Sequence, residues 1–174
     1  MTDRIPTRIP ELTLRFAEAS DAELLLRLIR ELAEYEKLSH DVVADADTIR
    51  ESLFGEGAVA EAVIAEYEGA AVGMAVFFHN FSTFIGRRGM YLEDLYVNPD
   101  FRGKGIGETL LAYLAKLAKA RDCGRIEWSV LDWNESAIRF YKKLGAGAMD
   151  DWTVFRLGVD GIARLAERFD QSGS

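Results

Sequence analysis

Apolar residues recur along the chain with two different spacings, and the change from one to the other predicts an alternation of strands and helices. A spacing of two residues predicts strands at 12–16, 59–67, 71–78, 91–97, 125–131 and 152–159. A helical spacing predicts helices at 20–37, within 41–57, at 106–118, at 134–144 and at 162–169. Strands and helices interleaved in this way favour an α/β (α+β) domain, in which helices cover the faces of a sheet.

Turn and cap residues mark the ends of several of these elements. Ser20-Asp21-Ala22-Glu23 has the pattern of a capping box that opens the first helix. Glu68-Gly69 predicts a hairpin turn between two strands, and residues 80–88 are predicted as a loop. We predict a single domain over the whole chain of 174 residues, with flexible ends at 1–10 and 170–174.

A glycine-rich, basic loop joins the strand at 91–97 to the longest predicted helix. Its residues are Arg102, Gly103, Lys104, Gly105, Ile106 and Gly107. Glycines let a backbone approach a ligand closely, and a helix N-terminus offers unpaired N–H groups and the positive end of a dipole. Two full positive charges add to this attraction. The loop therefore predicts a seat for an anion, with phosphate or pyrophosphate as the best match.

Other glycine loops fit the same residues less well. Lys104 is followed by glycine rather than Ser or Thr, which excludes a Walker motif. The dinucleotide fingerprint is G-x-G-x-x-G, whereas this loop has G-x-G-x-G. A Rossmann motif also has an acid at the end of the next strand, whereas Glu127, at the expected distance, falls inside a predicted strand. From this loop alone, a glycine-rich connection without a ligand remains an equal alternative.

Composition narrows the classes of partner and compartment. The chain has 29 acidic residues against 21 Lys plus Arg, a net charge of −8. This charge attracts small cations and disfavours nucleic acid and anionic membranes, so we expect neither as a partner. A single cysteine, Cys123, excludes an internal disulfide, and no spacing of metal ligands is present, so we predict no metal. Without a signal-like or membrane-length apolar run, the expected location is cytoplasmic.

Several stretches resemble a known family. R-G-K-G-I-G after a strand is similar to the R-x-x-G-x-G/A acetyl-CoA signature of the GNAT acetyltransferase superfamily. YLEDLYV, VLDWNESAIRFYKKLGA and RLIRELAEYEKL resemble the diamine (spermidine/spermine) acetyltransferases, and FSTFIG and VLDWN resemble their thialysine branch. The resemblance spans roughly residues 12–159. It implies a GNAT fold, with a mixed, mostly antiparallel central sheet and helices on both faces.

The resemblance implies acetyl-CoA as co-substrate, bound where the strands 91–97 and 125–131 diverge. The glycine loop would hold the CoA pyrophosphate, and the pantetheine arm would pair with the backbone of Leu95, Tyr96 and Val97. A main-chain N–H in that stretch would polarise the thioester carbonyl. Asn134 matches a family residue that contacts CoA, and it is equally suited to cap the helix that follows it.

Two side chains are the candidate catalytic groups. Tyr141 matches the family tyrosine that protonates the CoA thiolate, although an aromatic at this helical spacing more commonly packs against a core. Glu93 matches the base that takes the amine proton through water. Strand alternation sends Glu93 and Asp94 to opposite faces, so only one faces the amine unless a bulge disturbs the pleat, as in the GNAT fold.

The acceptor site is predicted around these acids. Glu36 lies at the helix end that the family places beside the acceptor, and Asp151 would add charge from near the last strand, across the interface of a homodimer. The polyamine branch has an acid and a tryptophan where this chain has Ser82, Thr83 and Phe84. We therefore expect a small diamine or a lysine-like amino acid as acceptor. The alternatives are an acyl-CoA sensor without catalysis and, less favoured, a Rossmann-type nucleotide-binding protein.

Overall fold

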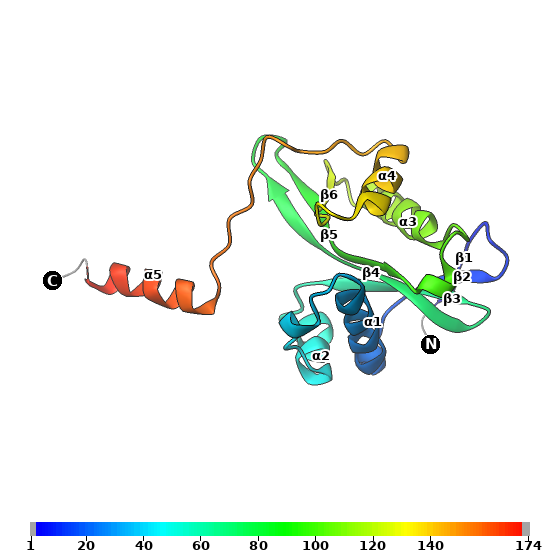
Figure 1. The fold of residues 1–174 in the computed structure, drawn as a ribbon, viewed down its shortest axis with the longest axis horizontal. Coiled ribbons are helices and arrows are strands. Elements are labelled where there is room, and N and C mark those ends of the chain that lie inside the picture. Colours follow the sequence, from blue (N-terminus) through cyan, green and yellow to red (C-terminus); the bar gives the residue numbers. More distant parts are fainter. Residues whose placement is uncertain (1–2, 172–174) are drawn as a thin grey trace. The chain divides into compact units, whose positions relative to one another are not determined.

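The computed structural model describes residues 3–171, and the chain divides after Leu131 into two compact units. The first unit is built on one six-stranded sheet in the order β1-β2-β3-β4-β5-β6. Every neighbouring pair is antiparallel except β5 and β6, which are parallel (Figure 1). The predicted mixed, mostly antiparallel sheet is confirmed. Its strands are β1 (Ile5–Pro6), β2 (Leu12–Phe16), β3 (Glu61–Tyr67), β4 (Ala70–Ser82), β5 (Arg87–Val97) and β6 (Ile126–Trp128).

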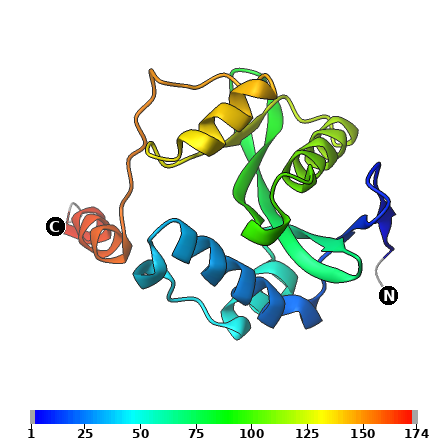
Figure 2. The same ribbon diagram turned by 45° about the vertical axis from the view of Figure 1, so that its right-hand side comes forward.

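Helices cover both faces of this sheet. α1 (Ala22–Tyr35) and α2 (Ala46–Phe54) lie on one face, and α3 (Ile106–Ala120) lies on the other (Figures 1 and 2). The apolar stripes that predict these helices are buried, with Leu28 of α1 and Leu110 of α3 fully enclosed. Burial of each such leucine contributes about 1.5–3 kcal/mol. Within residues 3–171, no helix combines the length and apolarity needed to cross a membrane.

The first unit departs from the predicted boundaries in three places. The predicted loop 80–88 is wrong, because β4 and β5 continue through it and pair as a long hairpin as far as Ser82 and Arg87. Part of the predicted N-terminal arm forms β1, which pairs with β2. The predicted capping box is replaced by a bond from the Glu18 N–H to the Asp21 carboxylate, because a 3₁₀ turn precedes α1. Residues 1–2 and 172–174 of the predicted flexible ends lie outside the described residues.

The second unit contains α4 (Glu135–Lys143) and α5 (Val159–Gln171). The strand predicted at 152–159 is wrong, since no described residue there forms a ladder and α5 already begins at Val159. Trp152, Val154 and Phe155 are 73%, 80% and 92% exposed. Alternating apolar residues form a strand only when another strand edge pairs with them. In the described part of the chain, no strand pairs with this segment.

Candidate active site

Strands β5 and β6 diverge where the sequence predicts the gap. Their parallel pairing covers only Met90 to Leu92 on β5 and Ile126 to Trp128 on β6. Farther along, Leu95, Tyr96 and Val97 of β5 pair with β4 on one side and with no described strand on the other. The open edge therefore presents backbone donors and acceptors to an extended, amide-containing ligand.

The Tyr96 side chain has a structural role beside this open edge. Its ring is buried, and its hydroxyl donates a hydrogen bond of 3.1 Å to Glu31 Oε2 on α1. Burial, followed by the bond to Glu31, raises the pKa of the Tyr96 phenol to about 12. The side chain thus fixes α1 to β5, while the backbone of the same residue remains at the open edge.

The glycine loop turns directly into α3. Gly103 and Gly105 have φ values of 78° and 79°, in the left-handed region that favours glycine. Gly105 is the N-cap of α3 and provides no capping side chain, so the first N–H groups of the helix point out of the loop without one. The Ile106 side chain is buried in the core and fixes the helix start. Gly107 follows it in the first turn.

Two tyrosines that were not predicted for the site, Tyr35 and Tyr67, lie against the cations of this loop. Arg102 Nε donates to Val97 O at 3.1 Å, and its guanidinium lies 4.3 Å from the centre of the Tyr35 ring. Lys104 Nζ lies 5.1 Å from the centre of the Tyr67 ring. Cation–π contacts of this kind orient a charge without neutralising it, so both cations remain able to bind an anion. Tyr35 and Tyr67 are far from the loop in sequence, and no local pattern marks them.

A β-bulge brings Glu93 and Asp94 into the same cavity. Val76 of β4 pairs with Asp94 and the next residue, Phe77, pairs with Leu92, so Glu93 is the extra residue on β5. Both carboxylates line a cavity of about 370 Å³. Strict alternation along β5 would place the two side chains on opposite faces of the sheet. The bulge disturbs this alternation and brings both acids to one cavity.

The cavity, here called the acidic cavity, also takes residues from α1 and the segment after it. Its carboxylates are Glu36, Asp41, Glu93 and Asp94, and no Lys or Arg side chain is among its described lining residues. Burial raises the pKa of Asp94 to about 6, with smaller contributions from Glu93 and Glu36, and burial also raises the pKa of Glu36. Two partly buried carboxylates, Glu36 and Asp94, together with the exposed Asp41 and Glu93, form a site for an alkylammonium group. Asp41 was not predicted for the site, because no local pattern marks it beyond its nearness to Glu36 in the sequence.

The other predicted site residues belong to the second unit. Asn134 is buried and its Oδ1 accepts a hydrogen bond of 3.2 Å from the Ala137 N–H, which confirms the cap of α4. Tyr141 lies in α4, with its ring centre 5.4 Å from that of Phe140. Asp151 lies in an exposed turn. Contact of Asn134 with CoA, proton donation by Tyr141 and amine binding by Asp151 stay predictions.

Comparisons with known proteins agree with this geometry. The model of the acetyltransferase (GNAT) family matches residues 24–146. The chain is 37% identical over 166 residues to the thialysine N-epsilon-acetyltransferase of Mus musculus, covering 89% of this chain and 97% of that protein. It is 38% identical over 164 residues to the Bos taurus protein of the same name, covering 88% and 96%. An integron cassette protein from the mobile metagenome of V. cholerae has a similar structure, with a TM-score of 0.76, 26% identity and coverage of 90% and 98%.

Proposed function

Since the chain belongs to the GNAT acetyltransferase family, we propose that it moves the acetyl group of acetyl-CoA directly to a primary amine of a small diamine or lysine-like amino acid. Members of the family use acetyl-CoA as co-substrate, and the chain is an acetyltransferase. The observation that carries the choice of acceptor is the acidic cavity, in which four carboxylates lie together beside β5. Such a cavity concentrates a cationic amine next to the open strand edge.

The residues present fit acetyl-CoA. The N–H groups at the start of α3, with Arg102 and Lys104, suit a pyrophosphate. The open edge of β5 at Leu95 and Val97 suits the amides of pantetheine, which would pair with it as an added strand. A main-chain N–H of the same stretch would polarise the thioester carbonyl as negative charge develops on its oxygen.

The proton transfers divide between two side chains. An alkylammonium has a pKa of about 10.4 and must lose a proton before its nitrogen can attack. Glu93, the more exposed of the two adjacent acids, would take that proton through water, while the half-buried Asp94 holds the ammonium. The nitrogen then forms a bond to the carbonyl carbon, the C–S bond breaks, and Tyr141 gives its hydroxyl proton to the thiolate. The nitrogen loses its second proton to water, and solvent reprotonates the Tyr141 phenolate. Transfer from a phenol of pKa about 10 to a thiol of about 8.5 costs only about 2 kcal/mol.

The hairpin between β4 and β5 favours a short acceptor. Ser82, one of the three residues that stand where the polyamine branch has an acid and a tryptophan, is buried, and its Oγ accepts a hydrogen bond of 3.3 Å from the Ile85 N–H. It therefore serves the turn and adds no charge for a distant ammonium. A long polycation loses one anchor, whereas a lysine-like amine, as in the names of the Mus musculus and Bos taurus relatives, needs only the acidic cavity.

The proposal extends to a homodimer in the cytoplasm. The second unit exposes a run of large apolar side chains, among them Trp152, Phe155 and Phe169, and exposed apolar surface of this extent is typical of an interaction site. A partner subunit would cover it and would bring its own Asp151 toward the acceptor. A single cysteine is compatible with a reducing compartment. We expect the mass in solution to be twice that of the chain, and a monomer at micromolar concentration would contradict the dimer.

Steady-state kinetics with thialysine, lysine and spermidine side by side test the function. We expect continuous CoA release with the lysine-like amines and a higher KM for spermidine. If the protein binds acetyl-CoA but no amine leads to continuous formation of free CoA, the result would support the acyl-CoA sensor instead. Lys104→Ala should raise the Kd for CoA about tenfold, since a charge-assisted contact is lost. Lys116→Ala, which removes an exposed lysine of α3, the helix that follows this loop, is the matched control and should leave that Kd unchanged.

A further inference from the structure

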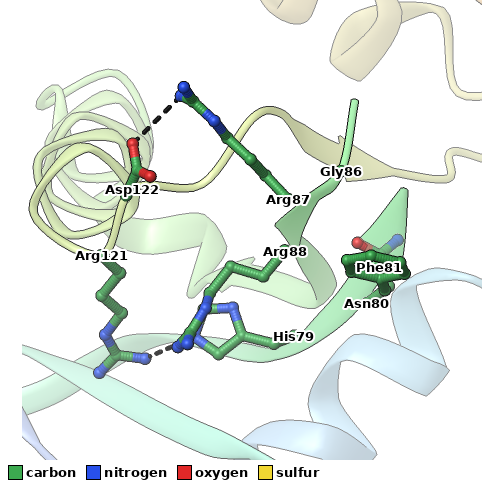
Figure 3. Close-up of a pocket in the computed structure, with 8 residues that line it drawn as sticks. All are labelled: His79, Asn80, Phe81, Gly86, Arg87, Arg88, Arg121 and Asp122. Carbon is green, nitrogen blue, oxygen red and sulfur yellow. Dashed lines mark hydrogen bonds and ion pairs between the residues drawn. The ribbon is translucent and has the colours of Figure 1, made fainter. Parts of the chain in front are cut away.

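A second, larger cavity lies at the other end of β5. It has a volume of about 630 Å³, and Arg87 and Arg88 at the first two positions of the strand line it together with Arg121, just after α3 (Figure 3). The glycine loop follows the last residue of the same strand, Val97. An extended strand of this length spans about 30 Å. This basic cavity is therefore separate from the anion seat of the glycine loop.

Arg121 and His79 form a fixed wall of the basic cavity. Arg121 pairs with both carboxylate oxygens of Glu61, at 2.5 and 2.8 Å, and its Nη1 lies 2.9 Å from His79 Nε2. A guanidinium only donates, so Nε2 accepts, and the proton lies on Nδ1, which donates to Gly89 O at 3.0 Å. Both ring nitrogens of His79 therefore have hydrogen-bond partners. This arrangement accounts for His79 without a catalytic role.

The guanidinium groups of Arg87 and Arg88 have fewer partners within the described residues than that of Arg121. The Arg88 guanidinium has no carboxylate or hydrogen-bond partner within the described part of the chain, and only the backbone of this residue is bonded, through its oxygen to the Gly124 N–H and in the ladder with β4. Arg87 Nη1 lies 3.1 Å from Asp122 Oδ1, in a pair whose two side chains are largely exposed and which is therefore weak. In Figure 3, Arg87 extends toward Asp122, whereas Arg88 extends in the direction of His79. Two guanidinium groups thus border one cavity in a chain whose net charge is −8.

We propose that the basic cavity, lined by Arg87, Arg88 and Arg121, binds a compact dianionic group, a phosphate or a dicarboxylate. The three arginines outnumber the single acid, Asp122, among the lining residues. The planar fork of arginine matches the oxygens of both groups in bidentate geometry. The volume exceeds that of one such group and lies in the range of small-molecule sites, and the ring of Phe81, 64% exposed on the lining, offers an apolar face to the rest of the ligand. The site does not depend on acetyl transfer.

Titration with inorganic phosphate and with succinate, at constant ionic strength, tests the site. The double variant Arg102→Ala, Lys104→Ala removes the cations of the glycine loop, and calorimetry in this background should still detect binding of at least one probe. Adding Arg88→Ala should weaken that binding about tenfold. Arg50→Ala, which removes an exposed arginine of α2 paired with Asp47, changes the net charge equally and should have no effect.

A variant that binds the anion more tightly than the wild type distinguishes an effect on the site from damage to the fold. Asp122 has a φ of 54°, a conformation that asparagine tolerates, so Asp122→Asn should fold normally. It releases Arg87 and removes the one acid of the lining, and phosphate or succinate should then bind several-fold more tightly. A preference for one probe identifies the group as a phosphate or a dicarboxylate. Absence of binding, loss of binding in the glycine-loop variant, or equal effects of Arg88→Ala and Arg50→Ala would overturn the proposal.

Discussion

Asp94→Asn is expected to stabilise the protein while it weakens binding of the amine. Burial, and then Glu93 and Glu36, raise the pKa of the Asp94 carboxyl from 3.8 to about 6. The folded state therefore binds this proton more tightly than the unfolded state, and stability is lost as the pH rises from about 4 to 6. Above that range the charged carboxylate costs about 3 kcal/mol, which a neutral amide does not.

Urea unfolding at two pH values measures the stability effect. At pH 7.5 the free energy of unfolding of Asp94→Asn should exceed that of the wild type by up to about 3 kcal/mol, and near pH 4 the two should converge. Glu34→Gln changes the net charge equally at an exposed position of α1 and should show neither effect. Equal stability of all three proteins at pH 7.5 would show that Asp94 is not held at a cost.

The same variant should lose affinity for the amine. Removing one partner of a partly buried charge pair costs about 2–5 kcal/mol, so the KM for the amine should rise about a hundredfold at pH 7.5. In the wild type, the KM should rise as the pH falls below about 6, because protonation neutralises the same carboxyl. Asp94→Asn should lack this pH dependence. An unchanged KM would remove Asp94 from the acceptor site.

Local patterns predict the parts of this site that depend on neighbours in sequence. The glycines and cations at 102–107 are adjacent to the helix that they open, and the structure has the loop, the left-handed glycines and the helix start as predicted. The Glu68-Gly69 turn is confirmed for the same reason, with φ values of 49° and 81°. In each case the conformation is determined by a few consecutive residues.

Local sequence patterns do not predict features that depend on contacts between distant segments. The bulge at Glu93 arises from the register between β4 and β5, which no residue of β5 specifies alone. Tyr35 and Tyr67 reach the glycine loop from α1 and β3, so only the folded chain brings them to it. The apolar alternation at 152–159 satisfies the strand pattern, but in the described part of the chain this segment pairs with no strand. The sequence of a segment indicates its propensity to form a strand, and the presence of a neighbouring strand decides whether the strand forms.

Tyr141→Phe is expected to lower kcat about a hundredfold and to leave the Kd for CoA unchanged. General acid catalysis commonly contributes a factor of this size, and the substitution removes only the hydroxyl that would protonate the leaving thiolate. The ring, which lies next to Phe140 in α4, is retained, so the helix should remain folded. The KM for the amine should also be unchanged, because the acidic cavity is untouched.

Tyr113→Phe is the matched control for this variant. Tyr113 lies in α3, with its ring centre 6.3 Å from that of Phe16, and loss of its hydroxyl should leave kcat within about twofold of the wild-type value, as expected for a substitution outside the reaction. Calorimetry with CoA and steady-state kinetics on the three proteins separate binding from turnover. A kcat for Tyr141→Phe equal to that of Tyr113→Phe would assign the thiolate proton to solvent. A parallel fall in CoA affinity would instead give Tyr141 a role in binding, since only a loss confined to kcat identifies an interaction made in the transition state.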